Sequence, residues 1–414
     1  MALDKLVDST QLDADLTSVA NAIRTKGGTS ASLAFPADFV TAIGNIQTGG
    51  GGRPEANEND VVLIDFDGRI LYSYTAAEFA NLSELPTIPV LKYPFLQQDG
   101  WNWTLSDAKT YVAKYKGLVI GAQYTTTDGK DHVYVDVPKS ANDNYFYLTV
   151  ACVNAGSGDG TVTVDWGDGT SPSSDTVSKN SSKGFTHYYS QAGLYDIKVS
   201  YSGGAVSVYG RVSAVGKRGF VKAITFGTAT NALQGKFPAG NYDIIILSGG
   251  KGSIGKLAEQ NYSSCYVFPR GWAGLYGTSN YFTGNANAVK SISFPNGAAY
   301  TGGGYNFSGC GCLRRIYFTE SITSVGQQTL YNCFSLARLD IPSTVTSIAT
   351  KAFAGCSGIR ELHFYSATPP TVAAVDAFTS LPTACKIYVP TGYLTAYTTA
   401  SNYPDPNTYT YAEE

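Results

Sequence analysis

The chain has 414 residues, of which 15% are charged, and it contains 45 glycines, 30 tyrosines and a formal net charge of −3. This composition favours glycine-punctuated β structure and argues against a helical bundle or a disordered chain. The slightly acidic balance and the lack of a basic run exclude electrostatic nucleic-acid binding, and no apolar run is long enough to span a membrane.

The first 48 residues are predicted to be a helical attachment segment. Four apolar residues recur at the spacing of one helix face: Leu12, Leu16, Val19 and Ile23. Helices this short cannot complete a core, so we expect the stripe to dock on copies of itself or on another protein. The alternative is a small hairpin packed on its own chain. Residues 49–59 are predicted to be a polar linker.

Residues 60–139 are predicted to form a small α+β module. The strands VVLIDF and RILYSYT flank an Asp67-Gly68 turn, and the strands LVIGAQYT and HVYVDV follow. Thr75 and Glu78 predict a capping box for a first helix, and Ser106 is expected to cap a second one, SDAKTYVAKY.

Two patterns in this module suggest chemistry. The apolar strand that ends in Asp65-x-Asp67-Gly68 resembles the nucleophile loop of haloacid-dehalogenase phosphotransferases, but Arg69 stands where that family has Thr or Val, and no later magnesium-binding segment follows. A hairpin turn explains the same residues. Trp101 and Trp103 suggest a sugar-binding platform, although a pair of this kind is more often core.

Residues 140–204 are predicted to form an Ig-like β-sandwich, because apolar residues alternate along three segments. The stretch VDWGDGT and the later stretch HYYSQAGLYDIKV resemble a PKD-type (polycystic-kidney-disease-type) immunoglobulin-like domain, which implies a spacer or adhesion module. Asp159, Asp165 and Asp168 lie near glycines, but their spacing is not that of a calcium-binding loop, so we interpret them as turn residues.

Residues 205–414 are predicted to form a solenoid with a C-terminal cap. Cys310, Cys333 and Cys356 recur every 23 residues, and the apolar residues around them keep the same step, which is typical of stacked repeats that bury their faces against one another. The core F-x-x-C-x-x-L-x-x-I-x-F resembles the BspA-type leucine-rich repeat family. The last strand is expected to end at Val389, and the helix GYLTAYTTA to cover the open end.

The residues between the inward apolar pairs of each repeat strand are expected to point outward and to stack in two ladders. The first ladder contains Arg315, Arg338, Glu361 and Lys386. The second ladder contains Tyr317, Asp340, His363 and Tyr388. We interpret this surface as a candidate receptor-binding face, with an ordinary solvated sheet face as the alternative.

We expect no enzyme, cofactor or metal site. The three histidines fall in different modules, so no local Ser/His/Asp or Cys/His set can be assembled. Cys310 and Cys312 lack the spacing of a zinc site, and the seven cysteines are expected to be reduced core residues.

The N-terminal stretch and the α+β module resemble tail-associated structural proteins of phages that infect Gram-positive gut bacteria. The resemblance implies a mainly β, multidomain virion protein, a tail fibre or baseplate component, made in the host cytoplasm. It is expected to contact other virion proteins through its N-terminus and a host-surface glycan or protein through its solenoid. A homo-oligomer is expected, with a trimer favoured. The alternatives are a head fibre or decoration protein and a bacterial surface adhesin; the absence of a secretory signal at the N-terminus, MALDKLVDST, favours the virion.

Overall fold

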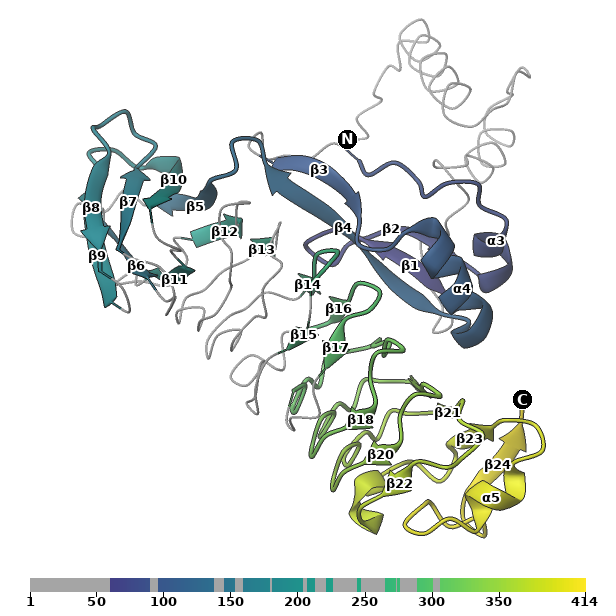
Figure 1. The fold of residues 1–414 in the computed structure, drawn as a ribbon. Helices are drawn as coiled ribbons and strands as arrows, with labels where there is room; N and C mark the ends of the chain where they lie inside the picture. Colours follow the sequence, from purple (N-terminus) through teal and green to yellow (C-terminus); the bar gives the residue numbers. More distant parts are fainter. Residues whose placement is uncertain are drawn as a thin grey trace, which may run out of the picture.

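We analysed a computed structural model of the protein. Its described residues are 60–89, 96–137, 145–152, 159–178, 181–203, 207–212, 221–225, 244–246, 265–272, 274–275, 289–300 and 306–414. The predicted attachment segment with its stripe (Leu12, Leu16, Val19 and Ile23) and the whole predicted linker lie outside them. The described part is mainly β, with few helices, and its C-terminal part is a solenoid (Figure 1).

The first described unit is an α+β module with a mixed sheet in the strand order β2-β1-β4-β3. Strand β1 pairs antiparallel with β2 and parallel with β4, while β3 pairs antiparallel with the second half of β4. The elements of this module are β1 (Val61–Ile64), β2 (Ile70–Tyr74), α3 (Ala76–Ala80), β3 (Leu96–Trp101), α4 (Leu105–Tyr115) and β4 (Leu118–Thr126).

The two helices of the module begin at capped residues. Thr75 and Glu78 form the predicted capping box of α3, in which each side chain accepts a hydrogen bond from the backbone N–H of the other residue, at 3.2 and 2.7 Å. The predicted N-cap of α4, Ser106, is two residues too late. Thr104 has the extended backbone of an N-cap, and its Oγ1 accepts from the N–H of Asp107 at 3.1 Å, so Ser106 lies inside the first turn.

Strand β5 (Asp131–Val137) connects the α+β module to a unit of two sheets. The sequence pattern groups this strand with β4, but β5 pairs antiparallel with β10 and with β12. One sheet has the order β13-β12-β5-β10-β7-β8, and the other has the order β11-β6-β9. The remaining strands of the unit are β6 (Tyr145–Cys152), β7 (Gly160–Asp165), β8 (Ser173–Val177), β9 (Ser181–Tyr188), β10 (Gly193–Gly203), β11 (Ser207–Val212), β12 (Val221–Thr225) and β13 (Ile244–Ile246).

An aromatic cluster at the end of β7 accounts for the VDWGDGT and HYY motifs. Trp166 is fully buried, its indole stacks on the His187 ring with centroids 4.9 Å apart, and its Nε1 donates to Ser173 Oγ at 2.9 Å. Tyr189 OH donates to the carbonyl oxygen of Trp166, and His187 Nε2 lies 2.7 Å from Asp168 Oδ2. These residues therefore tie a polar turn to an aromatic core. The PKD-type identity of the unit stays a prediction.

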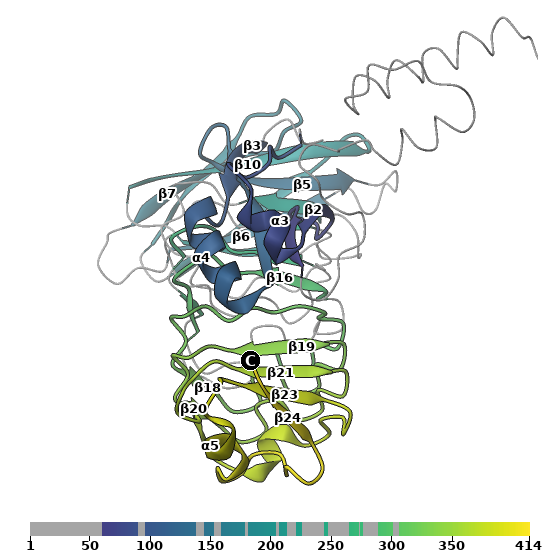
Figure 2. The same ribbon diagram turned by 90° about the vertical axis from the view of Figure 1, so that its right-hand side faces the viewer.

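The solenoid is built from coils that each add a strand to parallel sheets. Figure 2 shows the strands of one sheet, which we call the front sheet, stacked above one another, with β18 and β20 of the side sheet beside them. The front sheet contains β19 (Arg338–Ile341), β21 (Glu361–Phe364), β23 (Lys386–Val389) and β24 (Thr410–Glu413), and the side sheet contains β18 (Ser324–Val325), β20 (Ser347–Ile348) and β22 (Thr371–Val372). Earlier coils carry the parallel pairs of β14 (Cys265–Val267) with β16 (Ser291–Ser293) and of β15 (Gly274–Leu275) with β17 (Ala299–Tyr300).

The repeated cysteines form a buried ladder between the coils. Cys310, Cys333 and Cys356 are fully buried free thiols. The thiol of Cys333 donates to the carbonyl oxygen of Phe307 at 3.1 Å, and that of Cys356 donates to the carbonyl oxygen of Leu330 at 3.1 Å. Each thiol thus satisfies a backbone acceptor of the preceding coil, which explains why a small, weakly polar residue recurs at this position.

One turn of each coil requires a left-handed residue at the same repeat position. Gly309, Asn332 and Gly355 have φ values of 80°, 60° and 80° and follow each other at the 23-residue step. A Cβ on Gly355 would lie 2.1 Å from Asn332 Oδ1 on the preceding coil. The position therefore takes glycine or asparagine, the residue types that tolerate this conformation best.

The C-terminal end of the solenoid extends beyond the predicted last strand. Strand β24 continues the front sheet by pairing parallel with β23, whereas the sequence predicts β23 as the last strand. The expected end helix is α5 (Leu394–Thr398), which follows the 3₁₀ turn η2 (Val375–Phe378) in chain order. Tyr397 of α5 is buried, packs on Phe364 and donates to the carbonyl oxygen of Ser366 at 2.8 Å.

The α+β module packs against the solenoid through a buried asparagine. Asn102 is fully buried, and its Nδ2 donates to the carbonyl oxygen of Phe268 at 3.1 Å and to Ser293 Oγ at 2.9 Å. Its Oδ1 accepts from the N–H of Gly121 at 2.8 Å, and Trp103 Nε1 donates to the carbonyl oxygen of Phe294 at 2.7 Å. The module is thus docked on the solenoid.

Helix α4 extends the same contact along the solenoid. Tyr111 OH donates to the carbonyl oxygen of Phe318 at 2.7 Å, and Tyr115 OH donates to Glu320 Oε1 at 2.8 Å. Lys114 forms an ion pair with the same Glu320 carboxylate. These polar contacts surround an apolar contact that includes strand β14 and Tyr317.

Candidate functional site

The strand register confirms most of the two predicted ladders on the front sheet. Arg338 pairs with Glu361 and Glu361 with Lys386, while Asp340 pairs with His363 and His363 with Tyr388. Strands β19 and β21 are offset by 23 residues, the repeat length, whereas β21 and β23 are offset by 25, because the coil that contains η2 is two residues longer. Arg315 and Tyr317 precede the front-sheet strands in a segment that forms only an isolated bridge, from Ser291 to Arg315.

A network of charged and polar side chains occupies the centre of this face. The Arg338 guanidinium donates to Asp340 through Nη2 at 2.7 Å and Nε at 3.0 Å, and through Nη1 to Glu361 at 3.2 Å. Tyr365 OH donates to Asp340 Oδ1 at 3.0 Å. Burial is the largest single influence on the pKa of Arg338 and would lower it, but the hydrogen bond to Asp340 and the nearby charges of Asp340 and Glu361 together raise it, so the guanidinium stays charged.

His363 links this network to the last strand of the front sheet. Its Nδ1 lies 2.6 Å from Glu414 Oε1, and its ring stacks on Tyr388 with centroids 4.3 Å apart. Burial would raise the pKa of Glu414, but the hydrogen bond with His363 lowers it. The imidazole therefore holds the C-terminal residue against the face.

Burial divides the candidate receptor-binding residues into two groups. Asp340, His363 and Tyr317 are 2%, 3% and 8% exposed, so they are not on the accessible surface that the outward orientation predicts. The reason is packing by the chain itself: Gly117 of the α+β module lies against the Tyr317 hydroxyl, and Glu414 lies against His363. The second group is more accessible: Lys386 is exposed, and Arg315, Glu361 and Tyr388 are half-buried. The Arg338 side chain is only 9% exposed and belongs with the covered residues.

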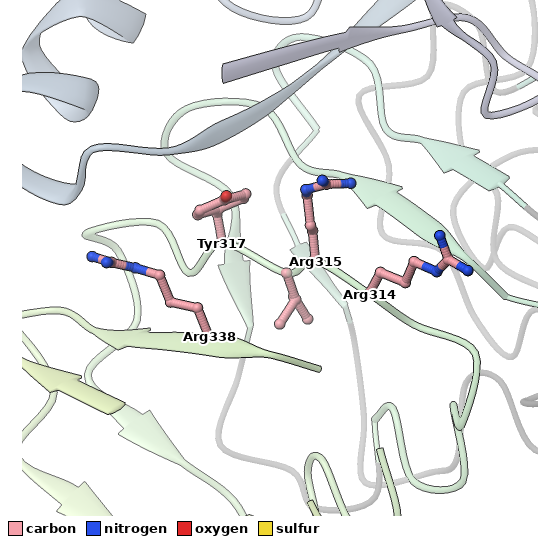
Figure 3. A pocket seen from close by; sticks show the side chains of 5 residues that line it. Arg314, Arg315, Tyr317 and Arg338 are labelled. Atoms are coloured by element: carbon pink, nitrogen blue, oxygen red, sulfur yellow. The ribbon is translucent and has the colours of Figure 1, made fainter. Parts of the chain in front are cut away.

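A small hollow lies beside the same network (Figure 3). It is lined by Arg314, Arg315, Ile316, Tyr317 and Arg338 and has a volume of about 10 Å³, which is enough for about one water molecule. Asp340 and Glu361 balance the charge of Arg338, and Asp60 adds a further carboxylate near Tyr317. The hollow is therefore too small to indicate a site for a ligand larger than water.

The loop that resembles a phosphotransferase nucleophile is a hairpin turn with a structural carboxylate. Asp65 Oδ1 accepts from the N–H of Phe66 at 2.9 Å and from Tyr124 OH at 2.8 Å, and Oδ2 accepts from Arg69 Nη2 at 3.0 Å. The side chain is only 2% exposed. Both carboxylate oxygens of Asp65 thus accept hydrogen bonds within the module, and the carboxylate faces the module core.

The other chemical candidates also have structural surroundings. Trp101 and Trp103 are buried, and their Nε1 atoms donate to the carbonyl oxygens of Pro86 and Phe294, so they form no exposed sugar platform. Within the described ranges, no group of three or more His, Cys, Asp or Glu side chains is placed to hold a metal ion. Among the helices that the structure describes, none is both long and apolar enough to cross a membrane.

Sequence reasoning missed two surface features of the solenoid. Phe334 is 53% exposed and lies over Gly311 of the preceding coil, where a Cβ would lie 2.3 Å from its ring. Gly311 stands one 23-residue repeat before Phe334, and this change from glycine to a large aromatic residue at one repeat position could have indicated the exposed ring. Val375 in η2 is 71% exposed, in an irregular coil that no longer keeps the 23-residue step.

Comparison with known proteins assigns a family to this part of the chain. Residues 278–392 match the family model described as BspA type leucine rich repeat region, in six copies. A search of the curated proteins finds no match to the chain. The matched residues include strands β16 to β23 and the cysteine ladder. The C-terminal solenoid of this protein therefore contains a BspA type leucine rich repeat region.

Proposed function

We propose that the protein is a structural component of a tailed phage or a phage-tail-like particle that binds the host cell surface through its solenoid. Residues 1–48 attach it to the particle in this proposal, and the unit with PKD-type motifs is a spacer. The BspA type region is the observation that carries the binding role, because stacked repeats present extended, ordered surfaces typical of binding scaffolds.

The position of the α+β module supports the far end of the solenoid as the binding region. The module contacts coils that contain Phe268, Ser293 and Phe318, whereas β23, β24 and α5 lie at the other end of the stack (Figure 1). Lys386 is exposed and Tyr388 is half-buried in β23. We therefore assign receptor contact to Lys386 and Tyr388, together with the exposed ring of Phe334.

The binding is non-covalent in this proposal. Several copies of the protein on one particle raise the overall affinity of the particle for the cell. A few exposed side chains on a narrow sheet give weak individual contacts, since exposed charges contribute little each. Copies held on one particle convert later contacts into intramolecular ones and raise the overall affinity. The partner class is a surface glycan or a surface protein of the host.

A competition experiment with the full chain tests the proposal. The purified protein should bind cells of the bacterium on which the particles grow, and it should reduce particle adsorption. The double variant Lys386→Glu with Tyr388→Ala should lose most of the binding. Lys351→Glu is the matched control, because it makes the same charge change at an exposed turn residue away from the front sheet. A full chain that neither binds these cells nor competes contradicts the proposal.

A further inference from the structure

A buried histidine lies at the connection between the α+β module and the two-sheet unit. His132 is the second residue of β5, and its side chain is 1% exposed. Strand β4 belongs to the sheet of the module and β5 to the sheet of β10, so the chain passes from one unit to the other in the turn 127–130. Only Asp131 separates His132 from this turn.

Both ring nitrogens of His132 face carboxylates. Nδ1 lies 2.8 and 3.0 Å from the two oxygens of Asp196 on β10, and Nε2 lies 2.9 Å from Asp128 Oδ1 in the turn. A neutral imidazole has one N–H and one lone pair, so it can donate to only one of the two carboxylates. The observed geometry therefore requires the imidazolium form.

The other charged and polar groups around His132 carry charges of both signs. Lys130 Nζ lies 3.8 Å from Asp128, and the carboxylate of Asp131 accepts from Tyr201 OH at 2.8 Å. On the neighbouring strands, Lys198 of β10 and Thr225 of β12 are the register partners of His132. Burial would lower the pKa of His132, but the hydrogen bonds with Asp196 and Asp128 outweigh it and raise the pKa.

We propose that His132 is a proton-dependent clamp that holds the turn 127–130 on strand β10. Loss of the proton places a nitrogen lone pair against one carboxylate. Asp196 is fixed within a long strand and contacts Nδ1 through both oxygens, so Nδ1 keeps its proton and Asp128 is released. The turn that connects the two units then loses its attachment to β10.

The direction of the pH dependence follows from the raised pKa. A histidine whose pKa is higher in the folded protein contributes its full stabilisation below the unfolded value of about 6.5. The contribution is lost as the pH rises through the folded value. The clamp is therefore closed at mildly acidic pH and opens as the pH rises through the folded pKa of His132, which lies above the unfolded one.

Tryptic cleavage after Lys130 measures the state of the clamp in the full chain. The rate is divided by the rate for a synthetic peptide of residues 124–136, which removes the pH dependence of trypsin itself. In the wild-type protein this ratio should rise several-fold as the pH passes the folded pKa of His132. His132→Gln should show the high ratio at every pH. The chain has only three histidines, so their ring NMR signals locate that pKa directly once His→Gln variants have assigned them.

Two further variants keep the test decisive if His132→Gln folds poorly. Asp128→Asn should keep the turn protected at every pH, because an amide can donate to a neutral Nε2 and accept from a protonated one. His187→Gln is the matched control: the His187 ring meets a single carboxylate, Asp168, so cleavage after Lys130 should keep its wild-type pH profile. A flat wild-type ratio, or a wild-type profile in Asp128→Asn, overturns the proposal.

Discussion

At the scale of single residues, burial decides which parts of the ladder face remain accessible. The alternation of inward and outward residues predicts the register of Arg338, Glu361 and Lys386 correctly. It does not predict exposure, since Asp340 and His363 are covered by contacts with residues distant in sequence. The same side chains that suggest a ligand-reading surface therefore serve mainly to connect strands of the solenoid to each other.

The cysteine ladder predicts a sharp difference in thiol reactivity between near neighbours. Burial raises the pKa of Cys310 and Cys356 to about 12, whereas Cys312 is half-buried. An alkylating reagent applied to the native protein at neutral pH should therefore modify Cys312 well before Cys310, because only the thiolate reacts. Mass spectrometry of tryptic peptides measures the order. Equal rates at the two sites would contradict the buried ladder.

The turn carboxylate of the VDWGDGT motif makes a second residue-scale prediction. Burial would raise the pKa of Asp168, but hydrogen bonds from Thr170 and His187 lower it. Its stabilisation is therefore present above the unfolded pKa and lost as the pH falls through the folded one. Asp168→Ala should reduce the free energy of unfolding at neutral pH by about 2 kcal/mol, the usual cost of losing hydrogen bonds to a charged group.

Urea denaturation measures this difference, and an exposed carboxylate serves as the control. Asp175 lies in β8 of the same unit, and its side chain is 42% exposed, so Asp175→Ala should change the stability little. If both variants lose the same stability, Asp168 has no special role in the turn.

At the scale of elements, local patterns predict much of the secondary structure and miss the long-range contacts. The capping box of α3, the strands of the module and the 23-residue coils follow from turn residues, caps and apolar periodicity. The pairing of β5 with β10 and the docking of the module on the solenoid do not follow, because these contacts join residues far apart in sequence. Asn102 illustrates the limit. Asparagine in a sequence usually indicates a turn, and only the three-dimensional fold shows that this residue lies between two units.

The contact between β4 and β14 depends on the absence of a side chain at Gly121. A Cβ at this residue would lie 2.3 Å from Val267 Cγ1. Gly121→Ala should therefore push β4 away from the solenoid and reduce the melting temperature by several degrees, since overpacking costs about 1–3 kcal/mol. Gly193→Ala is the control, because its Cβ would meet only ring atoms at 3.8 Å. Equal effects of the two variants in differential scanning fluorimetry would argue against this close contact.

At the scale of the whole molecule, the module and the solenoid behave as one packed body. Their shared cluster contains the module core together with Cys265, Val267 and Tyr317. Asn102→Ala removes the side-chain acceptor of the Gly121 N–H and the donor to Ser293 Oγ, and a buried group left without a partner costs about 1–3 kcal/mol. Hydrogen exchange should then show faster opening both in β4 and in β14.

Asn81→Ala provides the matched control for this substitution. Asn81 is an exposed C-cap residue of the same module, and its Nδ2 donates to the carbonyl oxygen of Ala77 in its own helix. Its replacement should leave exchange in β14 unchanged. Faster exchange confined to β4 in Asn102→Ala would mean that the two units are not coupled.

The central claim is that the solenoid is the outward, surface-binding end of a protein carried on a particle. Negative-stain electron microscopy of purified particles, with a gold label attached to a C-terminal tag on the full chain, tests it most directly. The account predicts labels on the particles, at the tips of projections away from the attachment point. Particles without label, with the label instead on the envelope of the producing bacterium, would contradict the account and favour a cell-surface adhesin.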